Sequence, residues 1–242
     1  MPMAELAYDG RSLSIRLMQA DEIPALYLPL RYDILYRELG WVAGDIQGPA
    51  GLVDNYDPVS KSFGIFTAQG GLMAAGRLIE ADRETRLPSA RLLAQQGRDC
   101  RFEPPVAELS RILVARPYRA IGLFPVLLFS GVLLACREGV RSLIITEKDD
   151  ERYAGFMARH GFRRQADGFS FSDGQLNPRE PAATYLLHMP DECREAIATA
   201  TAAKRAALLL KFADGAWQSA RPAGSREADG HTLAETSTDW PP

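Results

Sequence analysis

Two charged residues lie inside an apolar segment near the middle of the chain. Glu108 and Arg111 interrupt residues 106–115, which otherwise have the pattern of a buried strand. An unpaired charge in such a place costs several kcal/mol, so each needs a partner or a substrate. A carboxylate on a half-buried strand can have a raised pKa, which suits it to accept a proton. We therefore choose Glu108 and Arg111 as candidate catalytic residues, with an ion pair from Glu108 to Arg111 or Arg77 as the structural alternative.

A glycine turn and a long apolar helix follow this strand. The turn is Arg119-Ala-Ile-Gly122, and the helix extends to Arg137. A strand that stops at a glycine turn and feeds a helix aims unpaired backbone N–H groups and the positive end of the helix dipole at one point. This order of elements predicts a turn that binds an anionic group such as a phosphate.

A second group of charged residues precedes the strand. Asp54 and Asp57 lie in a long loop at a spacing of three, which suits pairing with arginines or with an ammonium group, although local turn capping is the alternative. The loop lacks the longer ligand pattern of a Ca²⁺ site. Because side chains alternate along a strand, Arg111 should point to the opposite face from Glu108. We expect Arg111 to bond to Asp54, to Asp57 or to the N-terminal segment.

The apolar pattern predicts the elements that position these residues. Gln69-Gly70-Gly71 is a hairpin signal, and Asp149 or Asp150 can cap a helix that ends near His160. Strands followed by strand–helix units predict an α/β or α+β domain with a mixed sheet. Strands are expected at residues 12–17, 63–67, 72–79, 106–115, 141–146, 162–172 and 183–189. Helices are expected from Asp21 to Gly40, at 88–97, from Gly122 to Arg137 and from Asp150 to His160.

The composition indicates one large domain with an extension at its end. The 242 residues are 46% hydrophobic, which is ample material for a core. We expect a domain at residues 1–190, a helix at 191–213 and a disordered tail at 214–242, where Gly, Ser, Thr and Pro accumulate.

Charge and cysteine usage exclude several classes of protein. The formal charge of −3, from 31 acidic and 28 basic residues, argues against a general nucleic-acid binder. The three cysteines are an odd number without metal-ligand spacing, so we expect no metal site, no disulfide framework and a cytoplasmic location. The apolar run at 121–136 is shorter than the roughly 20 residues of a membrane span, so we expect none.

Two motifs of the chain resemble the GNAT acyltransferase superfamily. One is the strand followed by Arg119-x-x-Gly122 and a long helix, and the other is Phe156-Met157-Ala158-Arg159-His160-Gly161-Phe162. The resemblance implies a mixed, mostly antiparallel central sheet flanked by helices. It also implies that the turn holds the pantetheine-phosphate arm of an acyl donor. The donor-binding residues implied in this way are Val114, Arg119, Gly122, Leu123 and Phe124.

The segment upstream resembles a narrower clade, the acyl-homoserine-lactone synthases and N-acyl amino acid synthases. The resemblance rests on residues in matching order and spacing over roughly residues 25–115, namely Arg31, Trp41, Asp54, Asp57, Arg77, Glu108 and Arg111. It implies that the first five of these form the acceptor side and its lid. Leu35 stands where the lactone synthases usually have phenylalanine, and Leu78-Ile79-Glu80 replaces their usual Leu-x-x-Thr segment. An N-acyl amino acid synthase is therefore ranked first, and a lactone synthase that uses S-adenosylmethionine second.

The reaction implied is attack of a primary amine on a thioester, with Glu108 contacting or deprotonating the amine. No cofactor is expected to be bound permanently. Acyl carrier protein is slightly preferred over acyl-CoA as donor and partner, because Phe124 and Pro125 leave the turn with fewer N–H donors. Met157 stands where many superfamily members have a tyrosine that protonates the leaving thiolate, and Tyr153 lies one turn earlier. The alternatives are a ligand-binding module without catalysis and an ordinary acetyltransferase.

Overall fold

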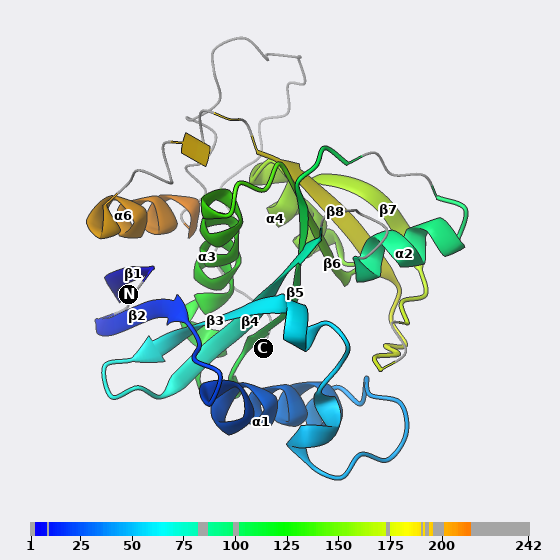
Figure 1. Cartoon of the computed structure of the whole chain (residues 1–242), viewed down its shortest axis with the longest axis horizontal. Helices are drawn as coiled ribbons and strands as arrows, with labels where there is room; N and C mark the ends of the chain where they lie inside the picture. Colours follow the sequence, from blue (N-terminus) through cyan, green and yellow to red (C-terminus); the bar gives the residue numbers. More distant parts are fainter. Residues whose placement is uncertain are drawn as a thin grey trace.

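The fold was obtained as a computed structural model, in which one eight-stranded sheet runs through the whole molecule in the order β1-β2-β3-β4-β5-β6-β8-β7 (Figure 1). All neighbouring strands are antiparallel except β5 and β6, which are parallel. The structure describes residues 3–8, 10–81, 87–98, 102–172, 175–189, 191, 194–195 and 201–213. The strands are β1 Ala4–Tyr8, β2 Arg11–Leu17, β3 Ser60–Thr67, β4 Leu72–Ala81, β5 Val106–Val114, β6 Ser142–Lys148, β7 Arg163–Phe169 and β8 Ala182–His188.

Helices cover both faces of this sheet. On one face lie α3 (Leu123–Arg137), α4 (Glu151–Arg159) and α6 (Ala202–Ala213), which pack on apolar residues of the sheet such as Leu109 and Ile145. The other face carries α2 (Pro88–Gln95) and an N-terminal helical segment made of η1 (Ile23–Tyr27), α1 (Leu28–Arg31) and η2 (Tyr32–Glu38). Figure 1 shows α1 and α3 on opposite sides of the sheet.

The parallel strands β5 and β6 are paired over only part of their length. Their pairing runs from Val106 opposite Ser142 to Leu109 opposite Ile145, although β5 continues to Val114 and β6 to Lys148. Beyond Leu109 and Ile145 the two strands no longer pair. This unpaired stretch, called the β5–β6 gap below, lies at the end of β5 that leads into the turn before α3.

Most predicted elements are confirmed, including the hairpin of β3 and β4, helix α2, the unit of β5 and α3, and the cap of α4. The Asp150 carboxylate accepts hydrogen bonds from the backbone N–H groups of Arg152 and Tyr153. Strand β1 was not predicted, since the first strand expected from the sequence is residues 12–17. The helical segment expected from Asp21 starts at Ile23, with Glu22 before it.

Of the helix predicted at residues 191–213, residues 192–193 and 196–200 lie outside the described residues, and the structure describes α6 at Ala202–Ala213. It packs against α3 and β1, with Ala206 and Leu209 buried in the main core. The tail at residues 214–242, predicted to be disordered, lies outside the described residues. Of the three cysteines, Cys136 is buried in α3 without a disulfide, and Cys100 and Cys193 are outside the described residues. None of the described helices is long and apolar enough to cross a membrane.

Candidate active site

The turn before α3 has the geometry predicted for it. After β5 the chain forms a short 3-10 helix, η6 (Arg116–Ile121), and Gly122 then adopts a left-handed conformation with φ of 68°. Helix α3 starts at the next residue, so its first N–H groups are directed toward the turn. The carbonyl of Gly122 accepts a hydrogen bond of 3.3 Å from the Tyr8 hydroxyl at the end of β1. Strand β1, which was not predicted, therefore contacts the Gly122 turn.

The side chains of the turn divide between the core and the surface. Arg119 donates from Nε to the carbonyl of Val114 at 3.0 Å, and its Nη2 lies 2.7 Å from Glu38 Oε2. Leu123 is fully buried in the core, so only its backbone can serve a donor. Phe124 is partly buried and meets the ring of Tyr153 edge-on, with centroids 5.5 Å apart.

Five charged residues on the α1 face form one network. Arg77 on β4 is 1% exposed, and its Nη1 donates to Asp54 Oδ1 and Asp57 Oδ1, both at 2.6 Å. Its Nη2 donates to Asp54 Oδ2 at 2.7 Å, and its Nε donates to Ser110 Oγ at 2.9 Å. Arg31 is fully buried and donates to both oxygens of Asp57, at 2.8 and 3.0 Å. The predicted pairing of the two carboxylates with arginines is confirmed.

The network keeps Asp54 ionised at neutral pH. Burial opposes ionisation, but the hydrogen bond from Arg77 and the charges of Arg77, Arg111 and Arg31 outweigh it and lower the pKa of Asp54 to about 2. Arg31, Arg77 and Arg111 thus all contact the two carboxylates of Asp54 and Asp57.

Arg111 has the predicted partner but not the predicted orientation. Its Nη2 lies 3.2 Å from Asp54 Oδ2. It does not point away from the face of Glu108, because β5 contains a bulge there. The register shifts opposite Ala75 and Arg77, and Arg111 has a φ of 53°, a conformation that non-glycine residues rarely adopt. The extra residue returns Arg111 to the same face as Ser110 and Glu108.

Trp41 lies in the segment that follows the N-terminal helical segment. It is partly buried against the apolar cluster beneath the N-terminal helical segment. Its backbone N–H donates to the carbonyl of Leu35 at 2.9 Å, and its carbonyl accepts from the N–H of Asn177 at 2.6 Å. Val42 also forms a bridge with Leu176. The loop after β7 thus contacts the segment that contains Trp41.

Glu108 is more enclosed than its predicted role requires. It is 2% exposed, and both of its carboxylate oxygens accept hydrogen bonds from Ser89 at the start of α2. The hydroxyl of Ser89 donates at 2.6 Å and its backbone N–H at 2.9 Å. Direct contact between Glu108 and an amine, as the sequence predicts, is therefore blocked in this conformation by Ser89.

One titratable residue near the gap was not predicted. Glu147 lies near the end of β6, on the face of α3 and α4, and forms no hydrogen bond or ion pair with any residue that the structure describes. Loss of water raises its pKa to about 8. The buried hydroxyl of Tyr185, on the neighbouring strand β8, also lacks a partner among the described residues. A single glutamate at the end of an apolar strand gives no sequence signal of this environment.

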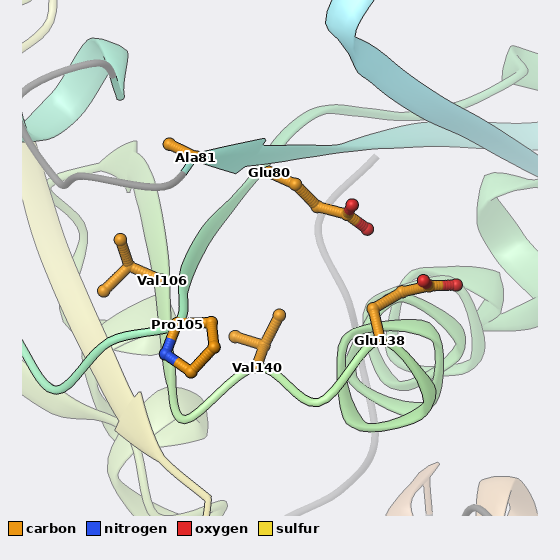
Figure 2. Close-up of a pocket in the computed structure, with 6 residues that line it drawn as sticks. All are labelled: Glu80, Ala81, Pro105, Val106, Glu138 and Val140. Atoms are coloured by element: carbon orange, nitrogen blue, oxygen red, sulfur yellow. The ribbon is translucent and has the colours of Figure 1, made fainter.

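The pocket shown in Figure 2 lies at the other end of β5 from Gly122. Its volume is about 260 Å³, and it is lined by Glu80, Ala81, Pro105, Val106, Glu138 and Val140. The carboxylates of Glu80 and Glu138 both pair with Lys61 Nζ, at 2.9 and 2.5 Å. None of the predicted site residues lines this pocket, so we do not assign it to the reaction.

The sequence matches no protein-family model and no curated protein. Solved structures do resemble this chain. FeeM, an N-acyl amino acid synthase from uncultured soil microbes, aligns with a TM-score of 0.53 and 20% identity over 74% of this chain and 91% of FeeM. BjaI, a CoA-dependent acyl-homoserine lactone synthase, aligns with a TM-score of 0.52 and 18% identity over 74% of this chain and 81% of BjaI.

A protein assigned as a phosphinothricin N-acetyltransferase aligns with a TM-score of 0.50 and 16% identity, over 74% of this chain and 99% of that protein. At these identities the likeness shows the fold. The chain has the GNAT fold, with a mixed, mostly antiparallel sheet flanked by helices, as the two sequence motifs predict.

Proposed function

We propose that this protein is an N-acyltransferase that moves a fatty acyl group from a thioester to the primary amine of a small acceptor, with an amino acid as the preferred acceptor. The observation that carries the proposal is the β5–β6 gap, which opens after Leu109 and Ile145 and leads to the left-handed Gly122 before α3. A thioester arm in this gap has its phosphate at the helix N-terminus and its carbonyl between the two strands.

The charged network supports an amino acid as the acceptor. Arg31, Arg77 and Arg111 gather around Asp54 and Asp57. Guanidinium groups bind carboxylates, so we propose that the carboxylate of an amino acid acceptor binds here and leaves its amine free to attack. The likeness to FeeM supports the same acceptor class, and the likeness to BjaI supports a lactone synthase as the second candidate.

The donor is proposed to be an acyl carrier protein, with acyl-CoA as the alternative. Pro125 in the first turn of α3 has no N–H, and the partly buried Phe124 lies beside it. The turn therefore offers fewer donors than a pyrophosphate requires, whereas the arm of a carrier protein has a single phosphodiester. Arg116, Arg119, Arg163, Arg164, Lys148 and Arg152 are the basic residues proposed to meet the carrier protein.

The test is release of free thiol from palmitoyl and octanoyl thioesters of acyl carrier protein and of CoA, with an equimolar mixture of the twenty amino acids. Mass spectrometry of the products identifies the acceptor. An N-acyl amino acid supports the proposal, and a lactone formed only when S-adenosylmethionine is supplied overturns the acceptor. Equal turnover of the two donors overturns the preference for carrier protein. Donor binding without thiol release indicates a module without catalysis.

A further inference from the structure

A line of hydrogen-bonded side chains joins the β5–β6 gap to the buried carboxylate of Glu108. Thr146 Oγ1 donates to Ser89 Oγ at 2.7 Å, and Ser89 Oγ donates to Glu108 Oε1 at 2.6 Å. Both distances are at the short end for hydroxyl donors. The three residues come from β6, α2 and β5, so the fold brings them together from three separate elements.

Thr146 is the end of this line that faces the gap. It directly follows Ile145, the last residue of β6 that pairs with β5, and it is partly exposed. Ser89, Glu108 and Thr184 are buried. Thr184 belongs to the neighbouring strand β8, and its Oγ1 lies 2.8 Å from Thr146 Oγ1. It is not part of the line from Thr146 through Ser89 to Glu108. Because Thr146 gives its own proton to Ser89, its oxygen can accept one from the gap.

We infer that Thr146 and Ser89 pass a proton from the attacking amine to Glu108, so that a buried glutamate serves as the base without touching the substrate. The inference rests on the proposed function. As the C–N bond forms, the amine proton moves to Thr146 Oγ1, the Thr146 proton moves to Ser89 Oγ, and the Ser89 proton moves to Glu108. The C–S bond then breaks with its electron pair on sulfur. The thiolate takes a proton from solvent, and Glu108 returns its proton to solvent along the same line.

The surroundings of Glu108 suit this role. Its second oxygen accepts from the backbone N–H of Ser89 in the first turn of α2, where the helix dipole favours a negative charge. Glu108 thus accepts two hydrogen bonds from Ser89, and the hydroxyls of Ser89 and Thr146 connect its carboxylate to the gap. If Glu108 served only to hold α2 in place, the hydroxyl of Thr146 would have no role in the reaction.

The experiment compares Thr146→Val with Thr146→Ser and with Thr184→Val. Valine keeps the shape of threonine but cannot relay a proton, serine keeps the hydroxyl, and Thr184→Val removes a buried hydroxyl from the same hydrogen-bond cluster but not from the path. Thiol release from palmitoyl-acyl carrier protein and palmitoyl-CoA with the twenty amino acids is measured from pH 6 to pH 9. Thermal unfolding of each variant identifies losses due to folding.

We expect Thr146→Val to release thiol about ten- to a hundredfold more slowly at pH 7, with Thr146→Ser and Thr184→Val within about threefold of the unmodified chain. The deficit of Thr146→Val should shrink as the pH rises, because solvent then deprotonates the amine. A merely structural defect would lower the rate by one factor at all pH values.

Two results overturn the relay while the proposed function stands. One is full activity of Thr146→Val, and the other is an equal, pH-independent loss in Thr146→Val and Thr184→Val. An unmodified chain that releases no thiol from either donor overturns the proposed function and the relay together.

Discussion

Two groups of carboxylates lie on the same face of the sheet and are held in opposite ways. Asp54 and Asp57 are bonded by the guanidinium groups of Arg31, Arg77 and Arg111. The carboxylate of Glu108, on the adjoining stretch of β5, is bonded by the hydroxyl and the backbone N–H of Ser89. Guanidinium groups cannot give up a proton near neutral pH, whereas a hydroxyl can pass one on.

This difference indicates a structural role for the carboxylates bonded by arginines and a role in the reaction for Glu108. A carboxylate between arginines stays ionised and fixes the position of several elements at once, here β4, the bulge of β5, α1 and the loop before β3. A carboxylate that ends a line of hydroxyls has a route for protons to the gap. We therefore expect changes in the Asp54 network to affect mainly stability, and changes at Glu108 to affect mainly the rate.

The largest expected effect is the loss of stability in Asp54→Asn. This change leaves Arg77 and Arg111 without their shared carboxylate in a buried site, which costs about 3–5 kcal/mol. Urea unfolding at pH 7 measures it. Glu22→Gln is the matched control, because Glu22 pairs with Arg16 near the surface and its loss should cost less than about 1 kcal/mol. Equal losses in the two variants would remove the distinction.

The next effect is on the rate, in Glu108→Gln. Glutamine keeps the shape and can still accept a hydrogen bond from Ser89, so unfolding should change by about 1 kcal/mol. Thiol release should fall about a hundredfold, because the amide cannot take the proton. Ser89→Ala should lose rate as well while it keeps its backbone bond to Glu108. If Glu108→Gln loses as much stability as Asp54→Asn but releases thiol at the unmodified rate, both groups of carboxylates have a structural role only.

The sequence predicts those features of the fold and site that depend on residues close together in the chain. The hairpin of β3 and β4, the glycine turn at Gly122 and the pairing of Asp54 with arginines follow from spacing and turn chemistry. The bulge at Arg111 could not be predicted by alternation, because it depends on the strand opposite. There Gly76 occupies a tight position, since a Cβ atom would lie 3.1 Å from the ring of Phe63. The contact of Ser89 with Glu108 joins residues from different elements and carries no sequence pattern.

A smaller effect tests a third kind of carboxylate, Glu147, on the opposite face. Its pKa is raised by loss of water from 4.5 to about 8, so between these values the folded chain holds a proton that the unfolded chain has released. Stability should therefore fall as the pH rises from about 5 to 8. Glu147→Gln should remove this slope and be more stable than the unmodified chain at pH 8, with a smaller difference at pH 5. Urea midpoints at the two pH values measure it, and parallel curves for the two proteins would contradict it.

The smallest expected effect concerns the Gly122 turn rather than the carboxylates. It tests whether binding of the acyl donor can be changed without a change in the rate of thiol release. Tyr8→Phe removes the hydrogen bond to the Gly122 carbonyl, worth about 1 kcal/mol, and so loosens the turn that we propose receives the phosphate. We expect the KM for the acyl donor to rise about two- to fivefold while kcat stays unchanged, because this bond holds the proposed donor-binding turn. Tyr36→Phe, which loses a bond to Asp45 at the surface, is the control and should leave the KM unaltered. A fall in kcat without a change in KM would place Tyr8 with the chemistry of Glu108 instead of with the binding of the donor.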